Sequence, residues 1–231
     1  MKVAGRTDRG KVREINEDTF GYHDHLFVVA DGMGGHQAGE VASAIAVETI
    51  LKADLTGEIK ATLRKTLAAA NQAILEKAAQ DKKLNGMGTT VAVLYLGAER
   101  AYVTHIGDSR VYYLSGNNLK QLTNDHSLVY ELVKSGEITA EEAKSHPQRN
   151  ILTRALGSNE TLEAEIVEIE VTKGDKFLLC SDGLTNSIPE ALIKELMSSE
   201  EDPEAIVDRM INSANELGGS DNITVILVEI E

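Results

Sequence analysis

The sequence predicts an α+β fold in which two antiparallel β-sheets pack together and helices cover their outer faces. Several apolar runs are joined by turns as short as residues 97–99 and 173–175. Such turns are too short for a helical crossover, so the strands they join run antiparallel. The strands are apolar on both faces, whereas each helical segment has one apolar face. Two stacked sheets with helices outside satisfy both patterns.

The individual elements follow from periodicity and from turn residues. Apolar runs predict strands at about residues 2–8, 18–22, 25–30, 89–96, 100–106, 109–115, 163–171, 175–181 and 222–230. Apolar residues three and four apart predict helices over residues 38–52, 58–80 and from Asp202 onward. Asp202 and Pro203 form a helix start, with an N-cap followed by proline, and Ser187 to Glu190 reads as a capping box for an earlier helix.

Composition indicates one domain over residues 1–231 and excludes two kinds of partner. A chain of 231 residues with 42% apolar content can bury one large core. Lys and Arg number 23 against 37 for Asp and Glu, a net charge of −14, which opposes binding to a nucleic-acid backbone. There is no signal-peptide pattern and no apolar run long enough to span a bilayer, so we expect a cytoplasmic protein without a membrane partner.

The common protein nucleophiles are absent from the sequence. Cys180 stands alone, which excludes a disulfide framework or a thiolate zinc cage within one chain. Cysteine phosphatases need an arginine six positions after the cysteine, where this chain has Asn186. No His-Glu-x-x-His, Gly-Lys-Ser/Thr or Gly-x-Ser-x-Gly motif occurs. We therefore expect Cys180 and His105 to be core residues.

Carboxylates stand at the ends of several apolar runs. Asp31-Gly32 and Asp182-Gly183 each end such a run, and Asp221 stands directly before another. Asp-Gly between apolar runs usually signals a hairpin turn. Here a helical pattern follows both pairs instead of a partner strand, which weakens the turn interpretation.

Three further acids occupy similar places, because Glu17 and Asp18 begin one strand and Asp108 ends another. Carboxylates that converge at a sheet edge repel one another in poorly solvated surroundings unless cations neutralise them. Oxygen ligands alone favour Mg²⁺ or Mn²⁺ over Zn²⁺. Two such ions about 4 Å apart are a common apparatus for displacement at phosphorus. The pattern therefore predicts metal-dependent hydrolysis of a phosphate ester.

Read in order, the motifs resemble the metal-dependent protein phosphatase family, the type 2C serine/threonine phosphatases, in the DGMGG form of its bacterial branch. The resemblance spans nearly the whole chain. The motifs are RxxxED from Arg13, VVADGMGGH through Asp31 and His36, GTT at 88–90, IGDSR at 106–110, ILTRALG at 151–157, CSDGL through Asp182 and SDN through Asp221.

The resemblance implies a four-layer αββα sandwich, with two central antiparallel sheets flanked by helix pairs and a metal site at one end. It also implies a Mn²⁺- or Mg²⁺-dependent phosphatase that hydrolyses phosphoserine and phosphothreonine in proteins. The reaction would be a direct attack by a metal-bridging hydroxide, without a phosphoenzyme. Residue by residue, the implied ligands are Asp31, Asp182 and Asp221 for one ion, and Asp31, the Gly32 carbonyl and either Asp18 or Glu17, with Asp18 favoured, for the second.

Three further roles come with the resemblance, each beside an alternative. Arg13 would hold the phosphate oxygens, a task that suits its planar fork, or it is a solvated surface cation. Asp108 would hold a third, weaker ion, or it caps a turn and pairs with Arg110. Met33 stands where many relatives have a proton-donating histidine, so His36 is the candidate general acid, with a metal-bound water as its rival.

A polar segment over about residues 124–160 is expected to form a flap over the cleft, with an ordinary surface loop as the alternative. The expected partners are phosphorylated proteins that a serine/threonine kinase modifies, with the kinase itself as a further candidate. The protein is expected to be a monomer. Two other functions compete. A phosphoprotein-binding pseudophosphatase would need a lost metal ligand, yet all the acids are present. A metal-dependent phosphodiesterase is opposed by the charge of −14.

Overall fold

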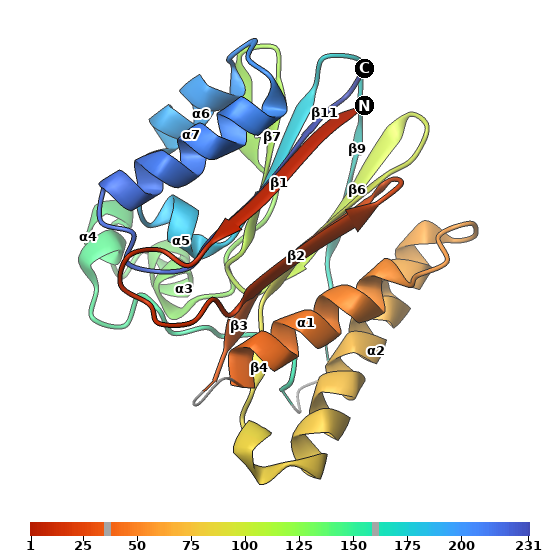
Figure 1. The fold of residues 1–231 in the computed structure, drawn as a ribbon, viewed down its shortest axis with the longest axis vertical. Helices are drawn as coiled ribbons and strands as arrows, with labels where there is room; N and C mark the ends of the chain where they lie inside the picture. Colours follow the sequence, from red (N-terminus) through yellow and green to blue (C-terminus); the bar gives the residue numbers. More distant parts are fainter. Residues whose placement is uncertain (35–37, 159–161) are drawn as a thin grey trace.

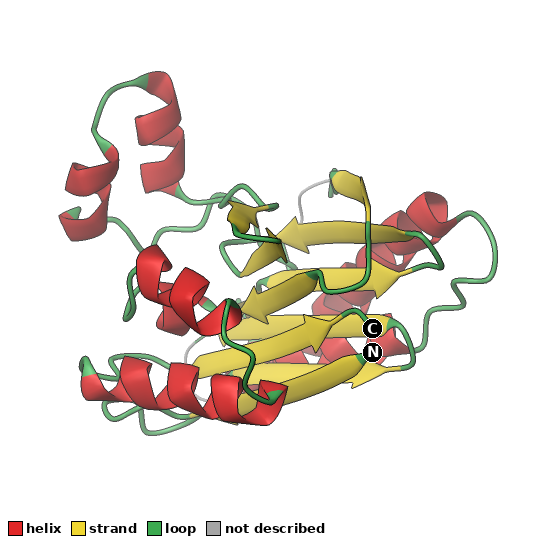
Figure 2. Cartoon of the chain, turned by 90° about the horizontal axis from the view of Figure 1, so that it is seen from above, coloured by secondary structure: helices red, strands yellow, loops and turns green. Residues whose placement is uncertain are grey.

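The computed structural model describes residues 1–34, 38–158 and 162–231. Two antiparallel sheets pack face to face, and a pair of helices covers the outer face of each (Figures 1 and 2). This is the four-layer αββα sandwich that the resemblance implied.

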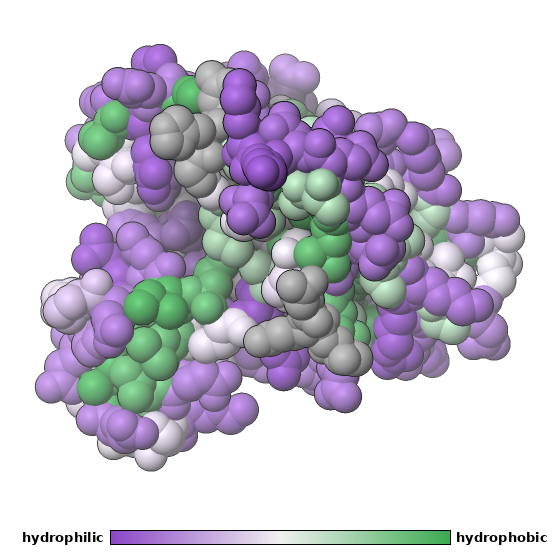
Figure 3. Space-filling view, turned by 90° about the horizontal axis from the view of Figure 1, so that it is seen from below, coloured by the Kyte–Doolittle hydropathy of each residue, from purple (hydrophilic) through white to green (hydrophobic). Residues whose placement is uncertain are grey.

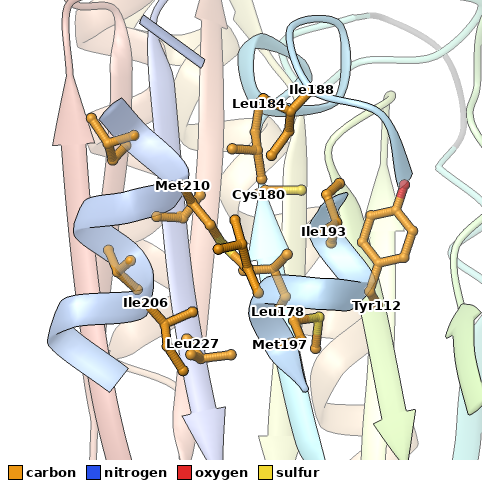
Figure 4. Packing of buried hydrophobic residues seen from close by; sticks show 14 of the residues in the cluster. Tyr112, Leu178, Cys180, Leu184, Ile188, Ile193, Met197, Ile206, Met210 and Leu227 are labelled. Atoms are coloured by element: carbon orange, nitrogen blue, oxygen red, sulfur yellow. The ribbon is translucent and has the colours of Figure 1, made fainter. Parts of the chain in front are cut away.

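The first sheet has five strands in the order β1-β11-β10-β7-β8. Its outer face is covered by α6 (Glu190–Met197) and α7 (Pro203–Glu216). Figure 4 shows Met197 of α6 and Met210 of α7 packed against Leu178 and Leu227 of the strands. The strands are β1 (Lys2–Asp8), β7 (Arg110–Ser115), β8 (Asn118–Gln121), β10 (Lys176–Cys180) and β11 (Ile223–Glu229).

The second sheet has the order β2-β3-β5-β6-β9, and the short strand β4 also pairs with β3. Its outer face is covered by α1 (Ala38–Leu51) and α2 (Ile59–Gln80). A single 3₁₀ turn, η1 (Lys82–Leu84), follows α2. The strands are β2 (Asp18–His23), β3 (Leu26–Met33), β4 (Gly88–Thr89), β5 (Val91–Leu96), β6 (Arg100–Ile106) and β9 (Ile166–Glu170).

Strand β3 shows why the central strands are apolar on both faces. Phe27 and Val29 lie in the core between the two sheets, whereas Val28 and Ala30 pack under α1 and α2. Successive side chains of a strand point to opposite faces. Both faces of β3 are covered by other layers, so both must be apolar.

The remaining helices lie in connections. The segment between β8 and β9 contains α3 (Leu128–Ser135) and α4 (Ala140–Ser145), and α5 (Asp182–Thr185) directly follows β10. Within the described ranges, no helix combines the length and the apolarity needed to cross a bilayer.

Two details of the predicted elements were wrong. The capping box at residues 187–190 is absent, because α6 begins after Pro189 without a side-chain cap. Strand β8 was not predicted, because its Asn-Leu-Lys-Gln sequence at a sheet edge has almost no apolar character and is held by pairing with β7. The N-cap at Asp202 is confirmed, since its carboxylate accepts a hydrogen bond from the Glu204 amide at 3.0 Å.

Candidate metal centre

The acids predicted from the sequence come together at one end of the sandwich, from both sheets. Asp18 and Asp31 lie directly opposite each other on β2 and β3 of the second sheet. Asp182 follows β10, and Asp221 stands just before β11, which is paired with β10 in the first sheet. Asp108 lies in the turn between β6 and β7.

The electrostatics of these groups show how close they are. Burial raises the pKa of Asp31 well above its usual range, and the charges on Asp18, Asp182, Asp108 and Asp221 raise it further. Burial, with the charges on Asp182 and Asp221, raises the pKa of Asp18 to about 7. Burial, with the charge on Asp182, raises the pKa of Asp108 to about 8. In the absence of a cation, the cluster therefore retains protons near neutral pH.

The donor atoms fit a bound cation. Oδ1 of Asp18 and Oδ1 of Asp182 are buried and have no hydrogen-bond partner among the residues that the structure describes. The other oxygen of each is satisfied, at 2.7 Å from Ser181 Oγ and 3.0 Å from Asn186 Nδ2, respectively. A buried polar atom without a partner costs about 1–3 kcal/mol, and a cation between the two carboxylates would remove that cost.

The same donors indicate the kind of ion. Over residues 1–34, 38–158 and 162–231, no three histidine, cysteine or acidic side chains are placed so that they could hold a metal ion as they stand. Without a cation, the carboxylates repel one another, so they are not drawn together around one point. Mg²⁺ and Mn²⁺ also take water and carbonyl oxygens as ligands, so a partly open set of carboxylates suits them.

The backbone of Asp31 is held by two threonines. Thr89 Oγ1 donates to the Asp31 carbonyl at 2.9 Å, and the Asp31 amide donates to Thr90 Oγ1 at 3.0 Å. Thr90 Oγ1 also lies 2.7 Å from Ser109 Oγ, next to Asp108. These hydrogen bonds fix the backbone that carries the Asp31 carboxylate.

Gly32 allows helix α1 to approach the metal-bearing strand. A Cβ at Gly32 would lie 2.1 Å from the carbonyl oxygen of Gly39 and 2.6 Å from that of Glu17. No side chain fits at that distance. The start of α1 therefore packs directly on the backbone that follows Asp31.

Glu17 and Asp18 are adjacent in sequence but differ in surroundings. The Glu17 carboxylate lies beside the start of α1, since a Cβ at Gly39 would be 2.6 Å from its Oε1. Its charged neighbours are Arg13, Glu40 and Asp221. The Asp18 side chain points into the cluster and is 7% exposed. The geometry therefore favours Asp18 over Glu17 as a ligand.

Arg13 lies at the rim of the cluster. Its Nη2 donates to Asp221 Oδ2 at 2.7 Å, while about half of its side chain, 49%, remains exposed. It lines a cleft of roughly 890 Å³. The other residues that line this cleft are Glu14, Ile15, Glu17, Gly34, Lys82 and Lys83.

The suggested pairing of Asp108 with Arg110 is wrong. Arg110 binds Asp125 instead, with Nε 2.9 Å from Oδ1 and Nη2 2.5 Å from Oδ2. The planar guanidinium matches that carboxylate with two parallel hydrogen bonds, so Asp108 has no such partner. Its carboxylate remains with Asp182 in the cluster.

The base of the segment at 124–158 is attached to the same turn. His126 donates its amide to the Gly107 carbonyl at 2.9 Å, and the Thr153 amide donates to the His126 carbonyl at 2.8 Å. The helices α3 and α4 beyond this base have no buried residue. Seen from below, the molecule is mostly hydrophilic, with the largest apolar group at the lower left of the view and smaller ones near the centre and at the upper left (Figure 3).

Sequence reasoning did not single out Ser181 and Asn222. Both stand beside a candidate ligand, in the motifs CSDGL and SDN, and that adjacency was the available signal. His36, the candidate acid, lies outside the described residues. Met33 is described, at 37% exposure, and its thioether cannot donate a proton.

Comparison with known proteins agrees with this geometry. The family model described as Protein phosphatase 2C matches residues 9–227. The chain belongs to the protein phosphatase 2C family. The recognition made from the ordered motifs is confirmed.

Two relatives show how far the family likeness extends. The chain is 44% identical to the serine/threonine phosphatase stp of Listeria monocytogenes over 241 residues, covering 99% of this chain and 96% of the relative. It is 40% identical to the serine/threonine protein phosphatase PstP of Mycobacterium tuberculosis over 233 residues, covering 100% of this chain and 45% of the relative.

Solved structures within the family are also similar. The crystal structure of Mycobacterium tuberculosis PstP/Ppp has a TM-score of 0.94 at 39% identity, covering 100% of this chain and 98% of the other. The catalytic domain of PstP in complex with two manganese ions has a TM-score of 0.92 at 37% identity, covering 100% and 98%.

Proposed function

We propose that this member of the family is a metal-dependent serine/threonine protein phosphatase that hydrolyses phosphoserine and phosphothreonine in proteins. The observation that carries the proposal is the convergence of Asp18, Asp31, Asp182 and Asp221. Among the described residues, one buried oxygen of Asp18 and one of Asp182 lack a hydrogen-bond partner. The related PstP catalytic domain has been solved with two manganese ions, which supports the same kind of centre here.

We assign the ligands as the sequence suggested. Asp31 lies between the other acids and is the natural bridge, since the charges of all of them act on it. We assign Asp108 to a third, more weakly bound ion. The proposed set is Asp31, Asp182 and Asp221 for one ion, Asp31, the Gly32 carbonyl and Asp18 for the other, and Glu17 as a residue of the rim.

The protein's own groups then divide the work. When bound, the two ions, Mn²⁺ or Mg²⁺, supply an activated water and offset charge on the phosphate oxygens. Arg13 is held at the rim by Asp221 and presents its remaining N–H groups to the phosphate. Thr89 and Thr90 keep Asp31 from shifting as charge develops. His36 remains the proposed donor of a proton to the leaving oxygen.

The cleft and the surrounding segments suit a protein substrate. Arg13, Lys82 and Lys83 place positive charge on the walls of the cleft, and this charge can attract a phosphate group. We propose that residues 1–231 form one catalytic domain and that residues 124–160 act as a flap. The substrates would be phosphoproteins that a serine/threonine kinase modifies, with the kinase itself included. A cytoplasmic monomer is our expectation from the sequence.

The proposal is tested by hydrolysis of a phosphothreonine peptide. We expect turnover with Mn²⁺, loss of turnover in excess EDTA and recovery when Mn²⁺ is restored. Cys180→Ala is the matched control, because burial raises the pKa of this thiol to about 12 and a nucleophilic cysteine needs the opposite shift. Activity that survives EDTA, or that disappears in Cys180→Ala, would contradict a metal-dependent mechanism. Turnover of a phosphodiester instead of the peptide would favour the competing phosphodiesterase.

Asp108→Ala separates a third-ion ligand from a turn residue. We expect the variant to bind two ions tightly by calorimetry and to lose turnover by about tenfold or more on a phosphopeptide, because a charge beside Asp182 is removed. A variant that loses only melting temperature and turns over normally at saturating Mn²⁺ would remove Asp108 from the site.

A further inference from the structure

The loop that carries Arg13 has to be held in place for the arginine to meet a phosphate group. It connects β1 to β2, and the Arg13 side chain is half exposed. A long exposed arginine carries up to about 2 kcal/mol of rotamer entropy that binding must overcome. Ordering the loop beneath Arg13 would be a separate entropic cost of binding. A backbone that is already fixed removes this second cost.

Asn222 holds both ends of this loop with one side chain. Its Nδ2 donates to the Arg9 carbonyl at 3.0 Å and to the Ile15 carbonyl at 2.9 Å. Its Oδ1 accepts from the Glu17 amide at 2.8 Å. The residue is 5% exposed, so these three bonds are shielded from water. The amide thus closes the loop at residues 9 and 15–17 and leaves Arg13 projecting between them.

The backbone of Asn222 contacts Asp221 and the glycine that follows Asp182. Its amide donates to Asp221 Oδ1 at 2.9 Å, while Arg13 donates to Asp221 Oδ2 at 2.7 Å. Its carbonyl packs so closely on Gly183, the neighbour of Asp182, that a Cβ there would lie 1.9 Å from the oxygen. One residue therefore joins the Arg13 loop, the Asp221 carboxylate and the helix that begins at Asp182.

We propose that Asn222 is a positioning residue for phosphate binding, which sets the place of Arg13 relative to the carboxylate cluster by clamping the loop at 9–17. The inference rests on the proposed phosphate-binding role of Arg13. Supporting contacts of this kind keep a binding group in its productive geometry. A small displacement of that group weakens binding or slows the reaction. Asn222 itself does not touch the substrate.

The test is a double-mutant cycle of Arg13→Ala and Asn222→Ala, measured as the KM for a phosphothreonine peptide at saturating Mn²⁺. A lost charge-assisted contact corresponds to roughly a ten- to hundredfold rise in KM, which we expect for Arg13→Ala. Asn222→Ala is expected to raise KM by about tenfold, and the double variant by no more than about twofold beyond Arg13→Ala alone. Without Arg13 there is nothing left for the clamp to position.

Asn71→Ala is the matched control for a structural effect. Asn71 is also buried, at 9% exposure, and its amide also joins separate segments, donating to the Ser158 carbonyl at 3.2 Å and accepting from the Gly157 amide at 2.7 Å. We expect this variant to lose melting temperature without a change in KM. Asn222→Ser, which keeps one short donor, provides a second variant if Asn222→Ala does not fold, and it should raise KM less.

Three results would overturn the inference. An unchanged KM in a folded Asn222→Ala or Asn222→Ser protein would do so while leaving the role of Arg13 intact. Additive effects in the double variant would show that Asn222 acts on KM independently of Arg13. An unchanged KM in Arg13→Ala would overturn both the inference and the phosphate-binding role on which it rests.

Discussion

Asp31→Asn is expected to abolish hydrolysis of a phosphothreonine peptide, even at saturating Mn²⁺. The change keeps the shape of the side chain and removes the charge on which the other four acids act. An amide cannot bridge two cations as a carboxylate does, so both ions lose affinity. We expect kcat to fall by roughly 10³-fold or more. Calorimetry with Mn²⁺ should show weakened binding in the same variant.

Asp175→Asn is the control, because Asp175 is a hydrogen-bonded carboxylate that lies at the opposite end of β10 from Asp182. It is 3% exposed, accepts from Tyr113 Oη at 2.7 Å and from the Thr172 amide at 2.8 Å. Those hydrogen bonds hold its pKa below the usual range, against the effect of burial. Asp175→Asn should therefore lose stability and keep its turnover. Near-normal turnover in a folded Asp31→Asn protein would contradict the two-ion mechanism.

The metal-free protein is expected to lose stability as the pH rises from about 6.5 to 8. The folded-state pKa values of Asp18, about 7, and Asp108, about 8, lie above those of the unfolded chain, and that of Asp31 is raised as well. The folded state therefore binds more protons in this window, so the free energy of unfolding falls as pH rises. We expect the melting temperature to fall by roughly 5–10 °C.

The pH window from about 6.5 to 8 excludes a competing effect of two histidines on stability. Burial and the nearby charge of His105 lower the pKa of His126 to about 4, and burial lowers the pKa of His105 as well. These histidines add stability as pH rises, but only up to the unfolded value of about 6.5. Above that pH the raised carboxylates act alone.

Mn²⁺ should reverse the effect, because it replaces the protons that the cluster otherwise retains. At about 1,000 times its dissociation constant, a ligand that binds only the folded state adds about 4 kcal/mol. The measurement is a melting curve at each pH, with EDTA or with Mn²⁺. Asp31→Asn should flatten the metal-free profile. A metal-free melting temperature that stays constant or rises between these pH values would show that the carboxylates are not close enough to interact.

How much of the site could be predicted depended on whether the signal was local. Asp31 and Asp182 were found because an apolar run, an Asp-Gly pair and a helical pattern follow one another in the sequence. Asp221 was found because it precedes an apolar strand. Asp18 and Asp108 were found because they stand at strand ends, and the ordered motifs added Arg13. The structure brings these carboxylates together, and their roles as metal ligands stay predictions.

The contacts that needed register or long-range pairing could not be predicted. Nothing local shows that Asp18 lies opposite Asp31, because a slip of one residue in the pairing would turn Asp18 to the other face. The bond from Arg110 to Asp125 was missed in favour of the nearer Asp108. Asn222 was missed because its three partners are more than two hundred positions earlier in the chain.

The division of the acids between the two sheets has a consequence for how the chain folds. Asp18 and Asp31 come together when the hairpin of β2 and β3 forms, a local event that closes a short loop at little entropic cost. Asp182 and Asp221 belong to the C-terminal part of the chain and join them only when the first sheet docks on the second. Half of the centre therefore forms early and the other half on docking. An ion held by Asp31, Asp182 and Asp221 would bind groups from both sheets, so it would slow unfolding by holding the docked sheets together.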